Sequence, residues 1–165
     1  MAQGIISITS VNVKDYAAKA WQEAKPVAES LPRPKRGAVA RFFPTDDCDI
    51  LIKVVLDEYS RKVLYALYTL KAYITWQTLQ SRFSNPESNA SHESLNFKTG
   101  GHVVFPGRTV TGQTATIMIP LHVIGEVKVG VTTVDTDHYY NILTECDVEV
   151  SEGGRLVALV ASDIE

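Results

Sequence analysis

The sequence predicts a single compact α+β domain, in which a mostly antiparallel sheet packs on one long helix, preceded by a mobile N-terminal arm. The chain has 165 residues, of which 45% are hydrophobic and 21% charged, as in one ordinary globular domain. A segment without Gly or Pro over 61–82 has helical periodicity, and the stretch 99–134 is rich in β-branched residues. We therefore place the arm at 1–41 and the folded domain at 42–165.

The expected arm is defined by proline and by charge. A short amphipathic helix over 13–24 is expected to end before Pro26. The stretch 31–37 combines two prolines, a glycine and three cations, which is typical of an extended or mobile linker. The segment 25–41 has a net charge of +4, and its basic residues are the expected contacts to membrane or nucleic acid: Lys25, Arg33, Lys35, Arg36 and Arg41.

Periodicity predicts the elements of the folded domain. Alternating apolar residues predict a strand over 48–56, and the following helix over 61–82 is expected to anchor the core through Leu64, Leu67 and Ile74. Strands are expected near 102–105, 114–119 and 126–134, with a short helix over 136–144. The segments 147–150 and 155–160 flank Ser151-Glu152-Gly153-Gly154, which predicts a hairpin.

The sequence contains no motif typical of catalysis or metal binding. Its four histidines have no spacing typical of zinc ligands, and neither cysteine lies in a nucleophile motif. The glycines of Gly100-Gly101-His102 do not match a phosphate-binding loop and are expected to form a turn. We therefore expect a protein that is not an enzyme, with no metal and no cofactor.

Charge is distributed unevenly along the chain. The formal net charge is -3, so no basic field of the whole molecule favours nucleic acid, and binding of anions is expected from the arm alone. The segment 135–165 has a net charge of -7, so a basic arm and an acidic terminal segment allow copies to attract one another. The apolar run over 156–161 is too short to span a bilayer.

The order of the segments carries a family resemblance. A basic arm precedes the segment 48–56, the long helix, a β-rich block with Gly101-His102-Val103-Val104-Phe105-Pro106-Gly107-Arg108, and the ending over 148–160. This order resembles the matrix proteins of rhabdoviruses, especially the short ones of plant-infecting members. The resemblance implies a viral matrix protein of the virion that self-associates, binds anionic lipid membrane and condenses the nucleocapsid. It also implies a location in the host cytoplasm and at the membrane surface.

Two alternatives stay open at the level of sequence. A nucleic-acid-binding viral coat or movement protein would use the same arm on RNA phosphates. A small ligand-binding domain or enzyme would contain a pocket that a single sequence does not reveal.

Overall fold

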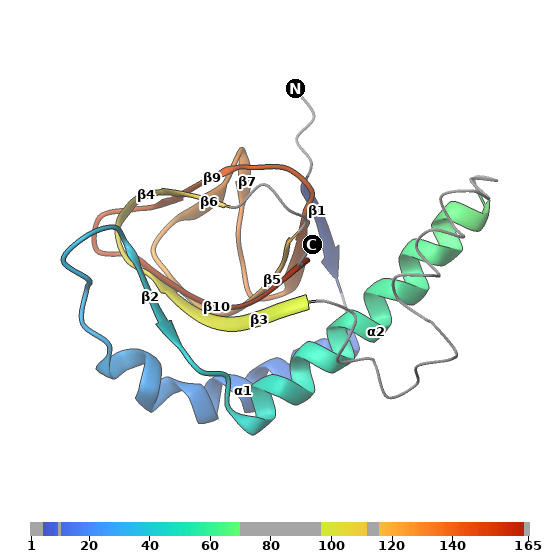
Figure 1. Cartoon of the computed structure of the whole chain (residues 1–165), viewed down its shortest axis with the longest axis horizontal. Coiled ribbons are helices and arrows are strands. Elements are labelled where there is room, and N and C mark those ends of the chain that lie inside the picture. Colours follow the sequence, from blue (N-terminus) through green and yellow to red (C-terminus); the bar gives the residue numbers. More distant parts are fainter. Residues whose placement is uncertain (1–4, 10, 70–96, 112–115, 164–165) are drawn as a thin grey trace.

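The computed structural model describes residues 5–9, 11–69, 97–111 and 116–163, which form two facing sheets with two helices outside the larger sheet (Figure 1). The expected α+β class with antiparallel sheets is confirmed. In chain order the elements are β1 (Ile5–Thr9), α1 (Val11–Ser30), β2 (Val39–Phe42), α2 (Asp46–Thr69), β3 (Phe97–Val104), β4 (Gly107–Val110), β5 (Thr116–Ile124), β6 (Val127–Val129), β7 (Thr132–Thr133), β8 (His138–Ile142), β9 (Asp147–Val150) and β10 (Arg155–Asp163).

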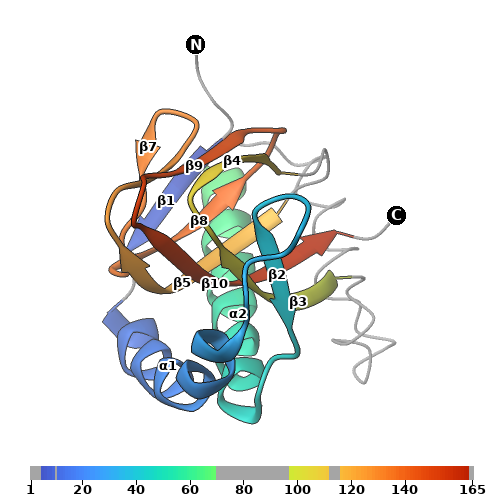
Figure 2. The same cartoon turned by 90° about the vertical axis from the view of Figure 1, so that its left-hand side faces the viewer.

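The strands follow the topology of an eight-stranded jelly roll. The six-stranded sheet has the order β1-β8-β5-β10-β3-β2, and the four-stranded sheet has the order β4-β9-β6-β7. From β3 onward the chain passes back and forth between the sheets, with β3, β5, β8 and β10 in the larger one and β4, β6, β7 and β9 in the smaller one. The two sheets face each other across a barrel interior, and β1 and β2 extend the larger sheet (Figure 2).

The larger sheet is buried on both faces. In β10, Val157 and Leu159 belong to the core beneath the helices, whereas Leu156 and Ala158 belong to the core between the sheets. All four side chains are buried, and their alternation is the period of two that a strand imposes. One layer of backbone therefore separates an outer core from an inner one.

Helix α1 corrects the prediction of a mobile arm. It continues past Pro26 to Ser30, because Ala20, Ala24 and Ala28 form a stripe at helical spacing that is completely buried in the outer core. This close packing outweighs the backbone hydrogen bond that a proline removes from a helix. The expected boundary between residues 41 and 42 falls inside β2, a strand of the larger sheet.

Helix α2 occupies the segment 48–56, which was predicted to be a strand. Its buried residues are spaced as on one face of a helix: Cys48, Leu51, Ile52, Val55 and Tyr59. The helix begins at Asp46, and the backbone N–H of Asp47 donates a 2.8 Å hydrogen bond to the Glu23 carboxylate of α1. A carboxylate at a helix N-terminus is stabilising because it meets unpaired N–H groups and the positive end of the helix dipole.

The expected core stripe of the long helix falls mostly outside the described part of the chain. Leu64 and Leu67 lie within α2, but their side chains are not among those described, and Ile74 lies outside the described residues. Within the described residues, neither helix has the length and apolarity needed to cross a membrane.

Two further predictions near the C-terminus are wrong. Residues 138–142 form β8 instead of a helix, because Tyr139 faces the helices while Tyr140 and Ile142 face the barrel interior. The strands on either side of 151–154 do not pair as a hairpin, because β9 belongs to the smaller sheet and β10 to the larger one. The turn at 151–154 therefore connects two sheets.

The pairing of β2 with β3 depends on a glycine. A Cβ atom at Gly101 would lie 2.4 Å from the Phe42 ring, whereas a Cβ atom at Gly100 would have no neighbour closer than 3.9 Å. We predict that Gly101→Ala lowers the free energy of unfolding by about 1–3 kcal/mol, the usual cost of overpacking. Gly100→Ala, the control on the same strand, should leave it close to the wild-type value. Urea unfolding measures both, and equal values would contradict this packing.

Candidate functional site

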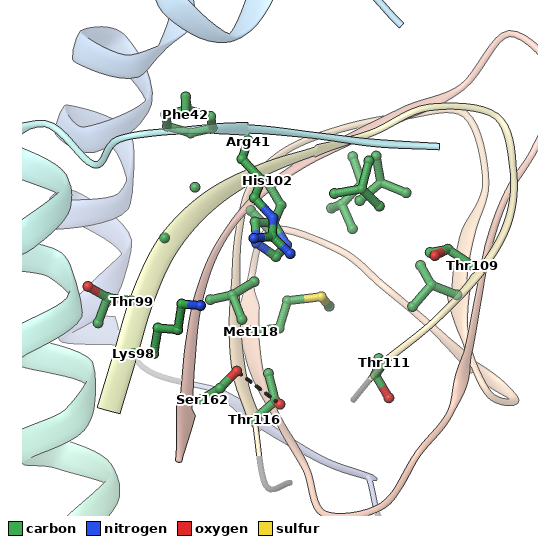
Figure 3. A pocket seen from close by; sticks show the side chains of 18 of the residues that line it. Arg41, Phe42, Lys98, Thr99, His102, Thr109, Thr111, Thr116, Met118 and Ser162 are labelled. Atoms are coloured by element: carbon green, nitrogen blue, oxygen red, sulfur yellow. Dashed lines mark hydrogen bonds between the residues drawn. The ribbon is translucent and has the colours of Figure 1, made fainter. Parts of the chain in front are cut away.

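A cavity of about 730 Å³ opens between the two sheets, at the end of the barrel where β3 begins and β10 ends (Figure 3). This volume is typical of pockets that hold small organic molecules. Its apolar wall comes from both sheets and includes Val39, Val104, Val110, Met118, Ile142, Val148, Leu156, Ala158 and Val160. Basic and hydroxyl side chains interrupt this wall on the side of the larger sheet.

The strand registers arrange the cavity face of the larger sheet in four rows. The first row, at the floor, contains Val39, Val104, Leu156 and Val123, and the second contains Arg41, His102, Ala158 and Pro120. The third row contains Gly100, Val160, Met118 and Tyr140, and the fourth, at the mouth, contains Lys98, Ser162, Thr116 and Ile142. Successive rows lie two residues apart on each regular strand, which is about 7 Å. The floor is therefore apolar, and the basic groups lie in the second and fourth rows.

Arg41 and His102 form the central pair of the cavity. They are directly opposite each other on β2 and β3, so both side chains point from the same face of the sheet, as Figure 3 shows. Opposite residues on antiparallel strands have Cβ atoms about 4.5–5.5 Å apart. The two side chains can therefore contact one ligand group together.

The cavity mouth is polar on the side of the larger sheet. Lys98 extends from the start of β3, and the hydroxyl oxygens of Thr116 and Ser162 lie 3.4 Å apart on the neighbouring strands β5 and β10 (Figure 3). Among the described residues that line the cavity there are three basic side chains and no carboxylate. The cavity thus favours an anionic group.

His102 is held largely neutral by its surroundings. Burial lowers the pKa of its imidazole, and the positive charge of Arg41 lowers this pKa further. A neutral imidazole can accept a proton or donate one hydrogen bond. His102 is therefore the lining residue that can exchange a proton near neutral pH.

The structure separates the five basic residues predicted to form one binding segment. Lys25, Lys35 and Arg36 are exposed, on α1 or on its connection to β2, and none of them lines the cavity. Arg33 Nη1 donates a 2.7 Å hydrogen bond to the backbone oxygen of Pro106, so it anchors the turn between β3 and β4. Only Arg41 of this group lies in the cavity.

Sequence analysis missed His102 and Lys98 as site residues. The glycines beside His102 were predicted to form a turn, but they lie within β3. A signal was present, because Lys98, Gly100 and His102 recur with a period of two and therefore share one face of a strand.

No protein-family model and no curated protein matches the chain. Among solved structures, a Pseudomonas putida prolyl-4-hydroxylase has a similar fold, with a TM-score of 0.52. The match covers 99% of this chain and 94% of the hydroxylase chain at 12% sequence identity. The chain therefore shares its overall fold with this hydroxylase. At this identity the similarity concerns the fold alone.

This similarity corrects the predicted function. The prediction of a viral matrix protein is contradicted, and so is the prediction that the chain is not an enzyme, because the fold is that of a hydroxylase and encloses a cavity. The alternative of a small ligand-binding domain or enzyme agrees better with both findings. Self-association, and the binding of lipid or RNA by the exposed basic residues, stay predictions.

Similarity to a hydroxylase raises the question of whether the chain has a metal centre. The described residues do not fit one. Non-haem iron oxygenases bind their metal through two histidines and one carboxylate. The described part of the cavity lining supplies one histidine, His102, and no carboxylate. Elsewhere in the described chain, no cluster of three or more His, Cys, Asp or Glu side chains is placed to hold a metal ion. The described residues therefore do not form the iron site of such an oxygenase.

The first prediction for the site concerns the coupling of Arg41 and His102. Arg41→Gln removes a positive charge that opposes protonation of the imidazole, so the pKa of His102 should rise. It should stay below the ordinary value, because burial remains. NMR titration of the imidazole measures it, and Arg36→Gln is the matched control. The same pKa in all three proteins would show that Arg41 does not face His102.

The second prediction concerns stability at low pH. Because the pKa of His102 is lower in the folded chain than the unfolded value of about 6.5, the unfolded chain binds a proton first as the pH falls. This residue therefore costs stability below about pH 6.5. The Tm of His102→Gln should fall less between about pH 7 and pH 5 than that of the wild type. Parallel curves would contradict the lowered pKa.

Proposed function

We propose that the chain binds a small organic acid in the barrel cavity, with its anionic group held by Arg41 and His102. The observation that carries this proposal is the placement of Arg41 directly opposite His102, on the adjacent strands β2 and β3, in a cavity whose described lining has no carboxylate. The similarity in fold to a prolyl-4-hydroxylase supports an enzyme-like or ligand-binding domain rather than a purely structural one.

Arg41 supplies the fixed charge of the proposed site. A guanidinium stays protonated in proteins and presents a planar fork of N–H groups that matches both oxygens of a carboxylate. His102, opposite it on β3, adds one N–H donor when neutral and a second charge when protonated. An anionic group between them would receive donors from two strands.

The surroundings strengthen this interaction. Ala158 follows His102 in the same row, so a small apolar residue leaves room beside the imidazole. Valine and leucine side chains form the floor below, and this apolar surface strengthens hydrogen bonds made by the half-buried His102, whereas Arg41 is exposed to solvent. Lys98 and the Thr116–Ser162 hydroxyl pair add donors nearer the mouth.

The same site can support proton transfer. A histidine whose pKa lies below its ordinary value is mostly unprotonated near neutral pH and can accept a proton. Arg41 beside it can stabilise negative charge that develops on the ligand. These two roles support the enzyme alternative in the same cavity as the proposed binding function.

The proposal is tested by comparing a charged ligand with its neutral counterpart. Isothermal titration with hexanoate should show binding, whereas hexanamide should bind about tenfold or more weakly, because it lacks the charge that Arg41 meets. Arg41→Gln should weaken hexanoate binding by a similar factor. Arg36→Gln, an exposed arginine outside the cavity, should bind like the wild type.

NMR gives the location of the bound acid. Saturating hexanoate should raise the pKa of His102, because an adjacent carboxylate stabilises the protonated imidazole. Hexanoate binding that survives Arg41→Gln unchanged and leaves His102 unshifted would overturn the proposal, as would the absence of binding by every organic acid tried.

A further inference from the structure

The cavity has an open, uncharged space between its two levels of basic residues. Gly100 faces it from β3, in the row between His102 and Lys98. A Cβ atom at Gly100 would lie 3.9 Å from the nearest atom, which is His102 Nε2, so the glycine leaves real space. Val160 and Met118 continue this row on β10 and β5. The middle of the cavity is therefore apolar and wide.

Phe43 lines the way out of this space. It follows the last residue of β2 and continues the alternation that places Val39 and Arg41 on the cavity face. Its side chain is 92% exposed although it belongs to the cavity lining, and Val110 on the opposite sheet is 53% exposed. Aromatic surface left in water is unfavourable, and apolar surface at the mouth of a pocket is typical of a place that a ligand covers.

The size of the cavity limits its occupant. A volume of about 730 Å³ is many times the roughly 30 Å³ that one water molecule takes up in the liquid, and a carboxylate group alone fills only a small part of it. Between the two basic levels the cavity adjoins Val160, Met118 and Phe43, whose side chains offer no hydrogen bonds, so a polar ligand body in that part would lose its hydration without gaining partners.

We infer that the ligand is an amphipathic acid with an unbranched acyl chain, and this inference rests on the proposed function. Its carboxylate lies between Arg41 and His102. Its chain crosses the space above Gly100, along Val160 and Met118, and leaves the barrel past Phe43. The basic pair fixes the head, and the apolar middle of the cavity selects the chain.

The test is a series of straight-chain acids measured by isothermal titration. Butyrate, hexanoate, octanoate and dodecanoate should bind with increasing affinity, by up to about fourfold for each buried methylene group. The gain should stop when the chain reaches solvent. If the acids bind in a manner that requires Arg41 but their affinity does not depend on chain length, the inference is overturned and the proposed function stands. If none of them binds, both fail.

Two variants locate the chain. Gly100→Val fills the middle row and should weaken dodecanoate binding at least tenfold more than it weakens butyrate binding. Phe43→Ser changes an exposed residue, so the fold should be retained, and it should weaken dodecanoate binding about threefold to tenfold through loss of apolar contact. Val131→Ser is the matched control, because Val131 is 79% exposed but does not line the cavity. Circular dichroism melts confirm that each variant is folded, and equal dodecanoate affinity in folded Gly100→Val and wild type would refute the assigned path.

Discussion

The burial of β10 on both faces is the constraint on which the rest of the structure depends. β10 pairs with β3 on one side and with β5 on the other, so it lies in the middle of the larger sheet. Val157 and Leu159 on one face hold the helices, while Leu156 on the other closes the floor of the cavity. A shift of this strand by one residue would exchange the two faces, with cavity residues turned toward the helices.

Two buried polar contacts fix where α2 lies on the sheet. The Tyr139 hydroxyl donates to Glu58 at 3.1 Å, and the Asn141 side-chain amide donates to the Tyr59 hydroxyl at 2.9 Å. Burial, followed by the negative charge of Glu58, raises the pKa of Tyr139, so this phenol stays a donor. Because hydrogen bonds require a specific geometry, these contacts orient the helix in a way that apolar packing alone does not.

Local pattern predicted the fold class correctly but not the pairing of its parts. The alternation over 48–56 was compatible with a strand, but Cys48, Leu51 and Val55 also share a helical face, and contact with α1 decides between them. The glycine turn at 151–154 was recognised, yet which sheet each flanking strand joins depends on residues far away in sequence. For the same reason, the charge pattern of the sequence identified Arg41 as a candidate binding residue, whereas His102 is recognised as its partner only from the pairing of β2 with β3.

The placement of Arg41 on an edge strand links occupancy of the cavity to motion of the sheet. Within the described chain β2 pairs with β3 alone, over four residues, whereas β10 is held from both sides. Edge strands with few hydrogen bonds open most readily in hydrogen exchange. A ligand that joins Arg41 to His102 would add a bridge across this short pairing at the edge of the larger sheet, so a filled cavity should slow amide exchange along β2.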